Sequence, residues 1–306
     1  MSEPPTRRRL AFAGVELDIG LDCPELADRV DTLYGPYLRA VDPDQAQTIA
    51  GPVDLRIDRE ADCGDSRPPA PHDDGVVYRL REPAAAASHR DRRIRGSVRT
   101  LAEIRERAQF RLIDGQHQVA LLHGAAIAHN GKVVMFPAHS GAGKTTLSAW
   151  FASQGESVLT DELIALHPDG RVGGFGQALN IKRHGMPVVS GFPNLASALA
   201  RAPGAGLGGR FLPLPPSGVD TPLAPGLLVF PQYRPGAGLT VTPVSAGQAL
   251  AMLLESLMNA RHLPRRGLGI AGALVRTVPA VRVQHDDLGA LSAWLDKRLA
   301  CPRPTA

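Results

Sequence analysis

The sequence predicts an α/β fold, α+β over the whole chain, with a small N-terminal α+β domain over residues 1–115 and a larger domain over residues 116–306. Three observations predict it. A chain of 306 residues is long enough for two ordinary domains. Short apolar runs rich in β-branched residues alternate with segments of helical periodicity. Between Val133 and Phe151 an apolar run meets a glycine-rich turn and then a helical pattern, as in many α/β cores.

In the N-terminal domain, alternating apolar and polar residues predict strands, and apolar residues at near-helical spacing predict helices. Residues 61–75 are rich in Asp, Gly and Pro, which indicates a loop. The predicted strands are Leu10–Ile19, Val53–Ile57 and Gly75–Leu80, and the predicted helices are Pro24–Leu38 and Ser97–Ile113.

In the larger domain, Asn130-Gly131 lies between two apolar runs and predicts a type I′ hairpin. Gly155 is placed to end the helix that follows the glycine-rich turn. Residues 201–226 are dense in Pro and Gly and predict a long loop. The predicted strands are Gln118–Leu122, Gly124–Ala128, Val133–Phe136, Ser157–Leu159, Leu163–Leu166, Arg171–Phe175, Leu227–Phe230 and Val278–Val283, and the later predicted helices are Ala246–Met258 and Asp287–Leu299.

The composition is that of a globular protein, with 43% hydrophobic and 21% charged residues. No apolar run reaches the ~18 residues of a membrane span, so no membrane partner is expected. The segment Met1–Arg9 is polar and basic and does not resemble a secretory signal. Cys23, Cys63 and Cys301 are far apart, which argues against a disulfide framework or a zinc site and fits a cytoplasmic location.

The net charge of +4 does not by itself indicate nucleic-acid binding. Only four of the basic residues are lysine, and the excess of arginine extends over the whole sequence, so no nucleic-acid partner is expected. The local cluster His89–Arg95 has two interpretations: a site for an acidic partner, or a solvated basic edge.

The segment from Pro137 to Thr146 has the layout of a phosphate-binding loop. Glycines let backbone N–H groups close around an anion, and the following helix adds its N-terminal donors. Lysine at 144 would reach phosphate oxygens, and the hydroxyl at 145 would bind Mg²⁺. Ala138 replaces the first glycine of the usual pattern, and an ordinary strand–helix turn without a ligand is the alternative. The candidate binding residues are Ser140, Gly141, Ala142, Gly143, Lys144, Thr145 and Thr146.

Asp161 and Glu162 follow the predicted strand Ser157–Leu159, one helix after the loop. Carboxylates at the carboxyl end of a neighbouring strand would face the same crevice as the loop. Phosphoryl transfer needs carboxylates in two roles, one for Mg²⁺ and one for the attacking hydroxyl. An exposed acidic turn or helix cap is the alternative interpretation.

Other polar residues are weaker candidates. His123 ends an apolar segment, whereas His117 and His129 are expected at the surface. Lys182 either stabilises a transferring phosphoryl group or lies on a solvent-facing strand edge. Arg210 and Arg234 are loop arginines, either solvated or closing over phosphates.

The order of these motifs resembles the HPr kinase/phosphorylase family, and in particular its shorter HPr-kinase-related kinases, some of which phosphorylate ribosomally made peptides such as lasso-peptide precursors. His123-Gly124 comes first, the loop ending in Lys144-Thr145 follows, and Asp161-Glu162 comes one helix and one strand later. The resemblance covers residues 118–260. It implies a nucleotide-binding core with a mixed sheet similar to that of phosphoenolpyruvate carboxykinase.

Carried over by position, the resemblance implies that His123 lies near the acceptor hydroxyl and that Asp161 is the general base. Thr145 would bind Mg²⁺, with Glu162 in place of the family's second aspartate. Lys182 stands where the bifunctional enzymes have the arginine of Leu-Glu-Ile-Arg-Gly, and Asn180 stands where they have the glutamate. This departure leaves phosphorylase activity, and HPr itself as substrate, without support.

The expected function is therefore ATP-dependent, Mg²⁺-requiring phosphorylation of a serine on a small protein or peptide. Asp161, assisted by His123, would take the hydroxyl proton, and Lys182 would add positive charge. Two alternatives stay open: a nucleotide-binding regulatory protein without transfer activity, and a small-molecule kinase. The N-terminal domain is expected to select the acceptor. A homo-oligomer is also left open, because the bifunctional relatives form hexamers.

Overall fold

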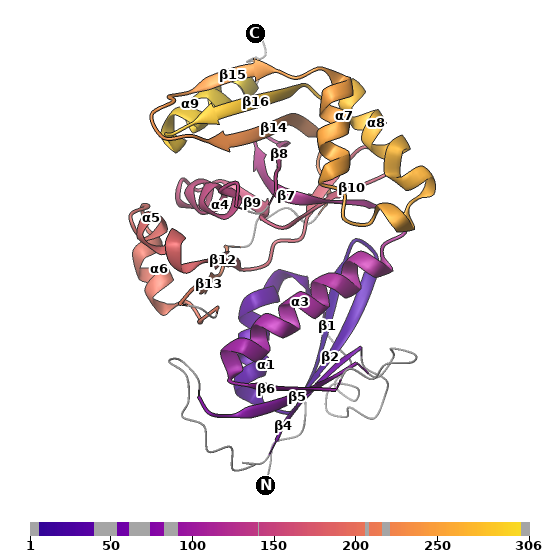
Figure 1. Ribbon diagram of the computed structural model, residues 1–306, viewed down its shortest axis with the longest axis vertical. Helices are drawn as coiled ribbons and strands as arrows, with labels where there is room; N and C mark the ends of the chain where they lie inside the picture. The colour runs from indigo at the N-terminus through magenta and orange to yellow at the C-terminus, as the bar shows by residue number, and fades with distance from the viewer. Residues whose placement is uncertain are drawn as a thin grey trace, which may run out of the picture. The chain divides into compact units, whose positions relative to one another are not determined.

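The computed structural model describes residues 6–39, 54–60, 74–82, 91–139, 141–205, 208–215 and 221–300 (Figure 1). The chain divides into two units, each with helices packed on a mixed sheet, so the fold is α/β. Unit 1 comprises Met1–Gly115, Asn180–His184 and Arg201–Pro213, and unit 2 comprises Gln116–Leu179, Gly185–Ala200 and Leu214–Ala306. Unit 2 therefore differs from the expected second domain over residues 116–306, because two segments of that range, Asn180–His184 and Arg201–Pro213, belong to unit 1.

Unit 1 is built on a six-stranded sheet. Its elements are β1 (Thr6–Phe12), β2 (Val15–Leu21), α1 (Pro24–Tyr34), β3 (Leu38–Arg39), β4 (Leu55–Arg59), β5 (Val77–Arg81), β6 (Arg92–Arg95) and α3 (Ser97–Gly115). The strand order is β3-β1-β2-β4-β5-β6, with β2 and β4 parallel and the other neighbours antiparallel. Figure 1 shows α1 and α3 side by side against this sheet, and their buried faces, which include Val30 and Ile104, form the core with it.

The predicted strand Leu10–Ile19 is instead a hairpin. β1 and β2 pair across a turn at Ala13 and Gly14, whose φ angles are 50° and 84°. Leu10 and Leu17 are cross-strand partners and both are buried, so the apolar alternation continues through the turn. Alternation alone therefore cannot distinguish one long strand from two short ones.

Unit 2 is built on an eight-stranded sheet. Its strands are β7 (Ala120–His129), β8 (Lys132–Pro137), β9 (Ser157–Thr160), β10 (Leu163–Leu166), β11 (Val172–Gly174), β14 (Pro225–Tyr233), β15 (Thr240–Pro243) and β16 (Ala280–His285). The order is β11-β10-β7-β8-β14-β16-β15, and β9 also pairs with β7. β8, β14 and β16 run parallel, whereas β7 runs antiparallel to β8, β9 and β10.

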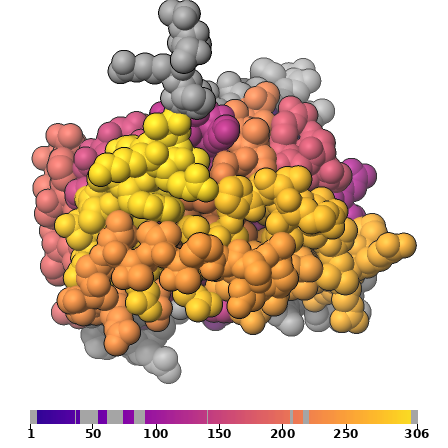
Figure 2. Space-filling model, turned by 90° about the horizontal axis from the view of Figure 1, so that it is seen from above, coloured from indigo at the N-terminus to yellow at the C-terminus, as the bar shows by residue number. Residues whose placement is uncertain are grey.

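Helices cover both faces of this sheet. The main ones are α4 (Lys144–Ser153), α7 (Ala246–Glu255), α8 (Leu268–Thr277) and α9 (Leu288–Leu299). Leu147 and Phe151 of α4 share one buried cluster with Leu291 and Leu295 of α9. α7 and α8 pack in a second cluster with the opposite side chains of the same strands. Figure 2 shows one surface of unit 2, on which the chain from β14 onward appears in orange and yellow.

Turn and cap chemistry explains several boundaries. The predicted hairpin at Asn130-Gly131 is confirmed, and both residues have positive φ. Ser245 and Gln248 form a capping box at the start of α7, and Asp287 accepts hydrogen bonds from the first amides of α9.

Three features differ from expectation. Gln118–Leu122 and Gly124–Ala128 form the single strand β7, since Gly124 is extended and sits within it. The helices α5 (Met186–Ser190), α6 (Leu195–Arg201) and α8 were not predicted. The predicted loop 201–226 contains β13 (Arg210–Leu212), which pairs with β12 (Leu179–Ile181). Among the described residues, no helix combines the length and apolar character that crossing a membrane requires.

Phe151 anchors α4 to the sheet, and its removal tests the core of unit 2. It is fully buried, and its ring stacks on Phe136 at a centroid distance of 6.0 Å. We expect Phe151→Ala to lower the free energy of unfolding by about 3–5 kcal/mol, because it leaves a cavity. Urea denaturation followed by tryptophan fluorescence measures this loss. Leu268→Ala, at a side chain that is 48% exposed, should cost less than about 1 kcal/mol, and equal losses would contradict the packing described.

Candidate functional site

The glycine-rich loop, residues 138–143, joins β8 to α4. Gly141 and Gly143 have φ angles of 89° and 86°, in the left-handed region that favours glycine. Gly143 is also the N-cap of α4, and it has no side chain with which to accept hydrogen bonds from the first-turn amides. Ala138 is not among the residues with positive φ, so alanine at this position causes no backbone strain. Glycine at positions 141 and 143 therefore suits the backbone conformation found there.

The side chain of Lys144 contacts the backbone of this loop. Its side chain is buried, and its ammonium group donates to the carbonyl oxygens of Ala138 at 2.9 Å and His139 at 2.8 Å. Both acceptors are backbone groups, which any residue type supplies. The positive charge is thus held at the centre of the loop.

The acidic turn after β9 contacts the first turn of α4. Thr145 donates its hydroxyl hydrogen to Oδ2 of Asp161 at 3.0 Å, and Asp161 is only 2% exposed. Thr160 holds the turn in place, since its Oγ1 accepts from the amides of Glu162 and Leu163, both at 3.0 Å, and donates to Phe175 O at 2.9 Å. A buried carboxylate is therefore fixed against the hydroxyl that follows the loop lysine.

His123 lies against the second carboxylate of this turn. Its Nδ1 is 3.2 Å from the carbonyl oxygen of Glu162 and 3.5 Å from its Oε2. Burial lowers the pKa of His123, and the positive charge of Lys144 lowers it further, while the charge of Glu162 acts in the opposite direction. Burial and the charge of Lys144 thus both favour the neutral form of the imidazole.

Strand β7 explains how these groups meet. β8 and β9 both run antiparallel to β7 and lie on opposite sides of it. Their carboxyl ends are therefore at the same end of the sheet. His123 and Gly124 of β7 lie at this end of the sheet. A Cβ on Gly124 would lie 3.0 Å from the backbone of both Phe136 and Pro137, so glycine permits the close approach of β7 to β8.

A segment after α7, unnoticed in the sequence, holds His123 from the other side. The amide of His123 donates to Ser256 O at 2.7 Å, and Met258 N donates to Leu121 O at 2.8 Å. Asn259 is fully buried, and its side chain accepts from Leu121 N and donates to Gln116 O and Val119 O. No local sequence signal marks this segment, because its partners lie more than a hundred residues away in the chain.

The structure brings together five of the residues predicted from the sequence: His123, Lys144, Thr145, Asp161 and Glu162. Gly141, Ala142, Gly143 and Thr146 lie on the loop or on the first turn of α4, and Ser140 lies outside the described residues.

Other candidates belong to unit 1 or are exposed. Lys182, which is exposed, and Asn180 belong to unit 1. Arg210 is also in unit 1, where it donates to Ala202 O at 2.9 Å. Arg234 is exposed beyond the end of β14.

His129 is buried, so its expected surface position is wrong. Its Nδ1 is 2.9 Å from Glu156 Oε1, and its Nε2 is 3.3 Å from Asp296 Oδ1. The carboxylates flank opposite edges of the ring. Because one cation cannot be bound through both ring nitrogens, the ring serves better as a hydrogen-bonded link between the end of β7, the start of β9 and α9.

Comparison with known proteins returned no match, either among models of protein families or among curated proteins. The chemistry of the site is therefore argued from its geometry.

The electrostatic contacts of His123 predict two opposite changes in its pKa. Glu162→Gln removes a negative charge and should move the pKa further below the ordinary value of about 6.5. Lys144→Met removes a positive charge and should raise it toward that value. Titration of the imidazole C–H resonances by NMR measures both shifts, with the exposed His117 as the internal control. Shifts in the same direction for the two variants would show that their charges do not act on His123.

Proposed function

We propose that this protein is an ATP-dependent, Mg²⁺-requiring kinase that transfers the γ-phosphate to a serine hydroxyl on a small protein or ribosomally made peptide. The observation that carries the proposal is the hydrogen bond from Thr145 to the buried Asp161. It joins the helix turn that follows the glycine-rich loop to a carboxylate, and the imidazole of His123 lies close to Lys144 and Glu162. This order of groups supports the resemblance to HPr-kinase-related kinases and to the core of phosphoenolpyruvate carboxykinase.

The chemistry of the residues fits ATP and Mg²⁺. Gly141 and Gly143 leave open space on the loop where other residues would carry a Cβ, which suits the close approach of a phosphate. Lys144 and the first-turn amides of α4 would bind its oxygens. The hydroxyl of Thr145 and the carboxylate of Asp161 are the oxygen ligands that Mg²⁺ prefers. Mg²⁺ held there would offset negative charge on the phosphates.

The contacts favour a division of labour between the two acids that differs from the sequence-based hypothesis. Asp161 contacts the expected metal ligand Thr145, whereas Glu162 contacts His123. We therefore assign Asp161 to the metal and the pair of Glu162 and His123 to the proton. In transfer, the serine oxygen forms a bond to the γ-phosphorus as the bond to the β-phosphate oxygen breaks. The hydroxyl proton passes to this pair, and ADP leaves.

A nucleotide-binding regulatory protein without transfer activity is the second candidate. The sequence favours it, because Ala138 replaces the first glycine of the usual pattern and Asn180 stands where the bifunctional enzymes have glutamate. A small-molecule kinase would use the same site with a different acceptor.

Incubation with γ-labelled ATP and candidate proteins and peptides tests the proposal. Label should appear on a serine of a macromolecular acceptor and should be lost with Lys144→Ala, because that variant removes the charge at the loop centre. Lys132→Ala, at an exposed position on β8, should retain transfer. ATP binding without any labelled acceptor would favour the regulatory protein. A labelled product of low mass would favour the small-molecule kinase.

The assignment of the two acids predicts different kinetic defects. Asp161→Asn should raise the Mg²⁺ concentration needed for half-maximal transfer. Glu162→Gln should leave that requirement unchanged and lower kcat by about 10²–10⁴-fold, the usual contribution of general-base catalysis. Both are measured by Mg²⁺ titration of transfer to the identified acceptor. The reverse pattern would restore Asp161 as the base.

A further inference from the structure

Three parallel strands of unit 2, β8, β14 and β16, finish at the end of the sheet where the glycine-rich loop lies. β14 pairs with β8, and β16 pairs with β14 on its far side. The acidic turn and His123 lie on the other side of β8, toward β7. Ligands of open α/β sheets bind outside the carboxyl ends of the strands. The side toward β14 and β16 is thus the one left for the sugar and base of a nucleotide whose γ-phosphate faces the acidic turn.

The last residues of β14 and β16 share a face of the sheet with α4. Val229 of β14 and Val283 of β16 belong to the buried cluster that includes residues of α4 and α9. Side chains alternate along a strand, so Tyr233 and His285, which end the two strands, point to this same face. Tyr233 therefore lies at the same end and on the same face of the sheet as the start of α4, which follows the glycine-rich loop.

Tyr233 and His285 form an aromatic pair at this position. They are register partners across β14 and β16, and their ring centroids are 6.0 Å apart at an interplanar angle of 68°. His285 is only 4% exposed, whereas Tyr233 is 59% exposed. Such an edge-to-face contact restrains the tyrosine ring while leaving much of the residue accessible to a flat ligand.

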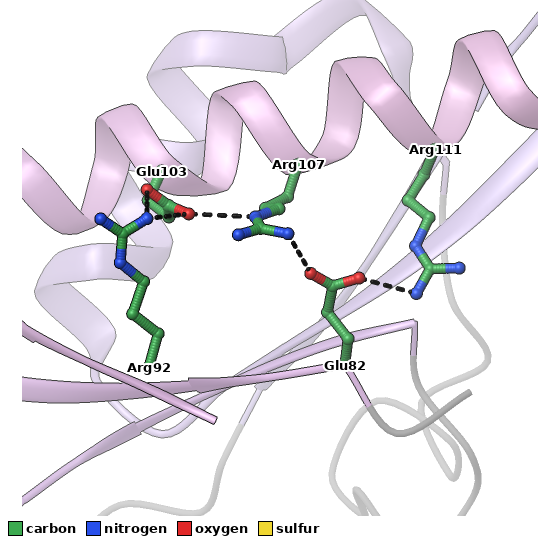
Figure 3. A network of polar contacts seen from close by, with 5 residues as sticks. All are labelled: Glu82, Arg92, Glu103, Arg107 and Arg111. Carbon is green, nitrogen blue, oxygen red and sulfur yellow. Dashed lines mark hydrogen bonds and ion pairs between the residues drawn. The ribbon is translucent and has the colours of Figure 1, made fainter. Parts of the chain in front are cut away.

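The surroundings of His285 differ from those of a buried charged group. Glu82 of unit 1, which is also buried, accepts from Arg107 at 2.7 Å and from Arg111 at 2.9 Å within the network of Figure 3. By contrast, Nδ1 of His285 is buried without a hydrogen-bond partner among the described residues. Burial lowers the pKa of His285, although the two aspartates that follow it act in the opposite direction. The imidazole is therefore better suited to packing against Tyr233 than to an ionic contact.

We propose that the ring of Tyr233 stacks on the base of the bound nucleotide and that this base is a purine. The inference rests on the proposed function, in which the glycine-rich loop binds a nucleoside triphosphate. A purine offers a larger flat face to an aromatic ring than a pyrimidine does. Stacking reads the face of a base and not its hydrogen-bonding edge, so this contact does not distinguish adenine from guanine.

Isothermal titration calorimetry of the full-length protein in Mg²⁺ tests the proposal with ATP, GTP, CTP and tripolyphosphate, which has no base. The wild type should bind ATP and GTP with similar Kd and CTP more weakly. Tyr233→Ala should raise Kd for ATP by about tenfold and leave Kd for tripolyphosphate unchanged, because it removes only the contact with the base. Tyr233→Phe keeps the ring and should bind ATP like the wild type.

The matched control is Leu268→Ala, at an exposed side chain of α8, which packs on the opposite face of the sheet. It should leave Kd unchanged for ATP and for tripolyphosphate. The proposal is overturned if Tyr233→Ala binds ATP like the wild type, if it loses tripolyphosphate to the same extent, or if CTP binds the wild type as tightly as ATP. Failure of the wild type to bind either ATP or tripolyphosphate would overturn the proposed function as well. Circular dichroism of each variant verifies that the chain is folded.

Discussion

The candidate site depends on the close passage of β7 between β8 on one side and β9 and β10 on the other. Each of these neighbours runs antiparallel to β7. The glycine-rich loop after β8 and the acidic turn after β9 therefore lie at the same end of the sheet. Gly124 makes this passage possible, because a Cβ there would collide with the backbone of β8. Apolar side chains on both faces of the strand then hold the position through two separate cores. His123, which precedes Gly124, therefore lies between the glycine-rich loop and the acidic turn.

Burial of charged groups at this edge is costly unless each finds a partner, and the contacts meet that condition. Lys144 donates to two carbonyl oxygens, and Asp161 accepts from the hydroxyl of Thr145. Neither of these contacts uses a charged partner.

Much of this arrangement follows from local signals, and the rest from contacts distant in sequence. The loop, the hairpin at Asn130-Gly131 and the acidic turn each reflect residues within a few positions of one another, so pattern and turn chemistry predict them. The burial of His129 was mispredicted because Asp296 reaches it from the far end of the chain. Asn259 was not identified from the sequence for a similar reason, since its three partners lie in the segment before and at the start of β7. An alternating pattern likewise shows which positions are apolar but not where the chain turns back, as it does between β1 and β2.

Adjacent acids illustrate why residue types alone do not assign roles. Asp161 and Glu162 lie in the bend between β9 and β10, and their side chains meet different surroundings. Asp161 turns toward α4 and is almost fully buried, whereas Glu162 turns toward His123 and keeps 20% of its side chain exposed. A carboxylate that must exchange a proton with an incoming hydroxyl needs such access, and one that holds a cation against a fixed hydroxyl does not. The difference in direction, more than the identity of either acid, therefore argues for Glu162 as the group that handles the proton.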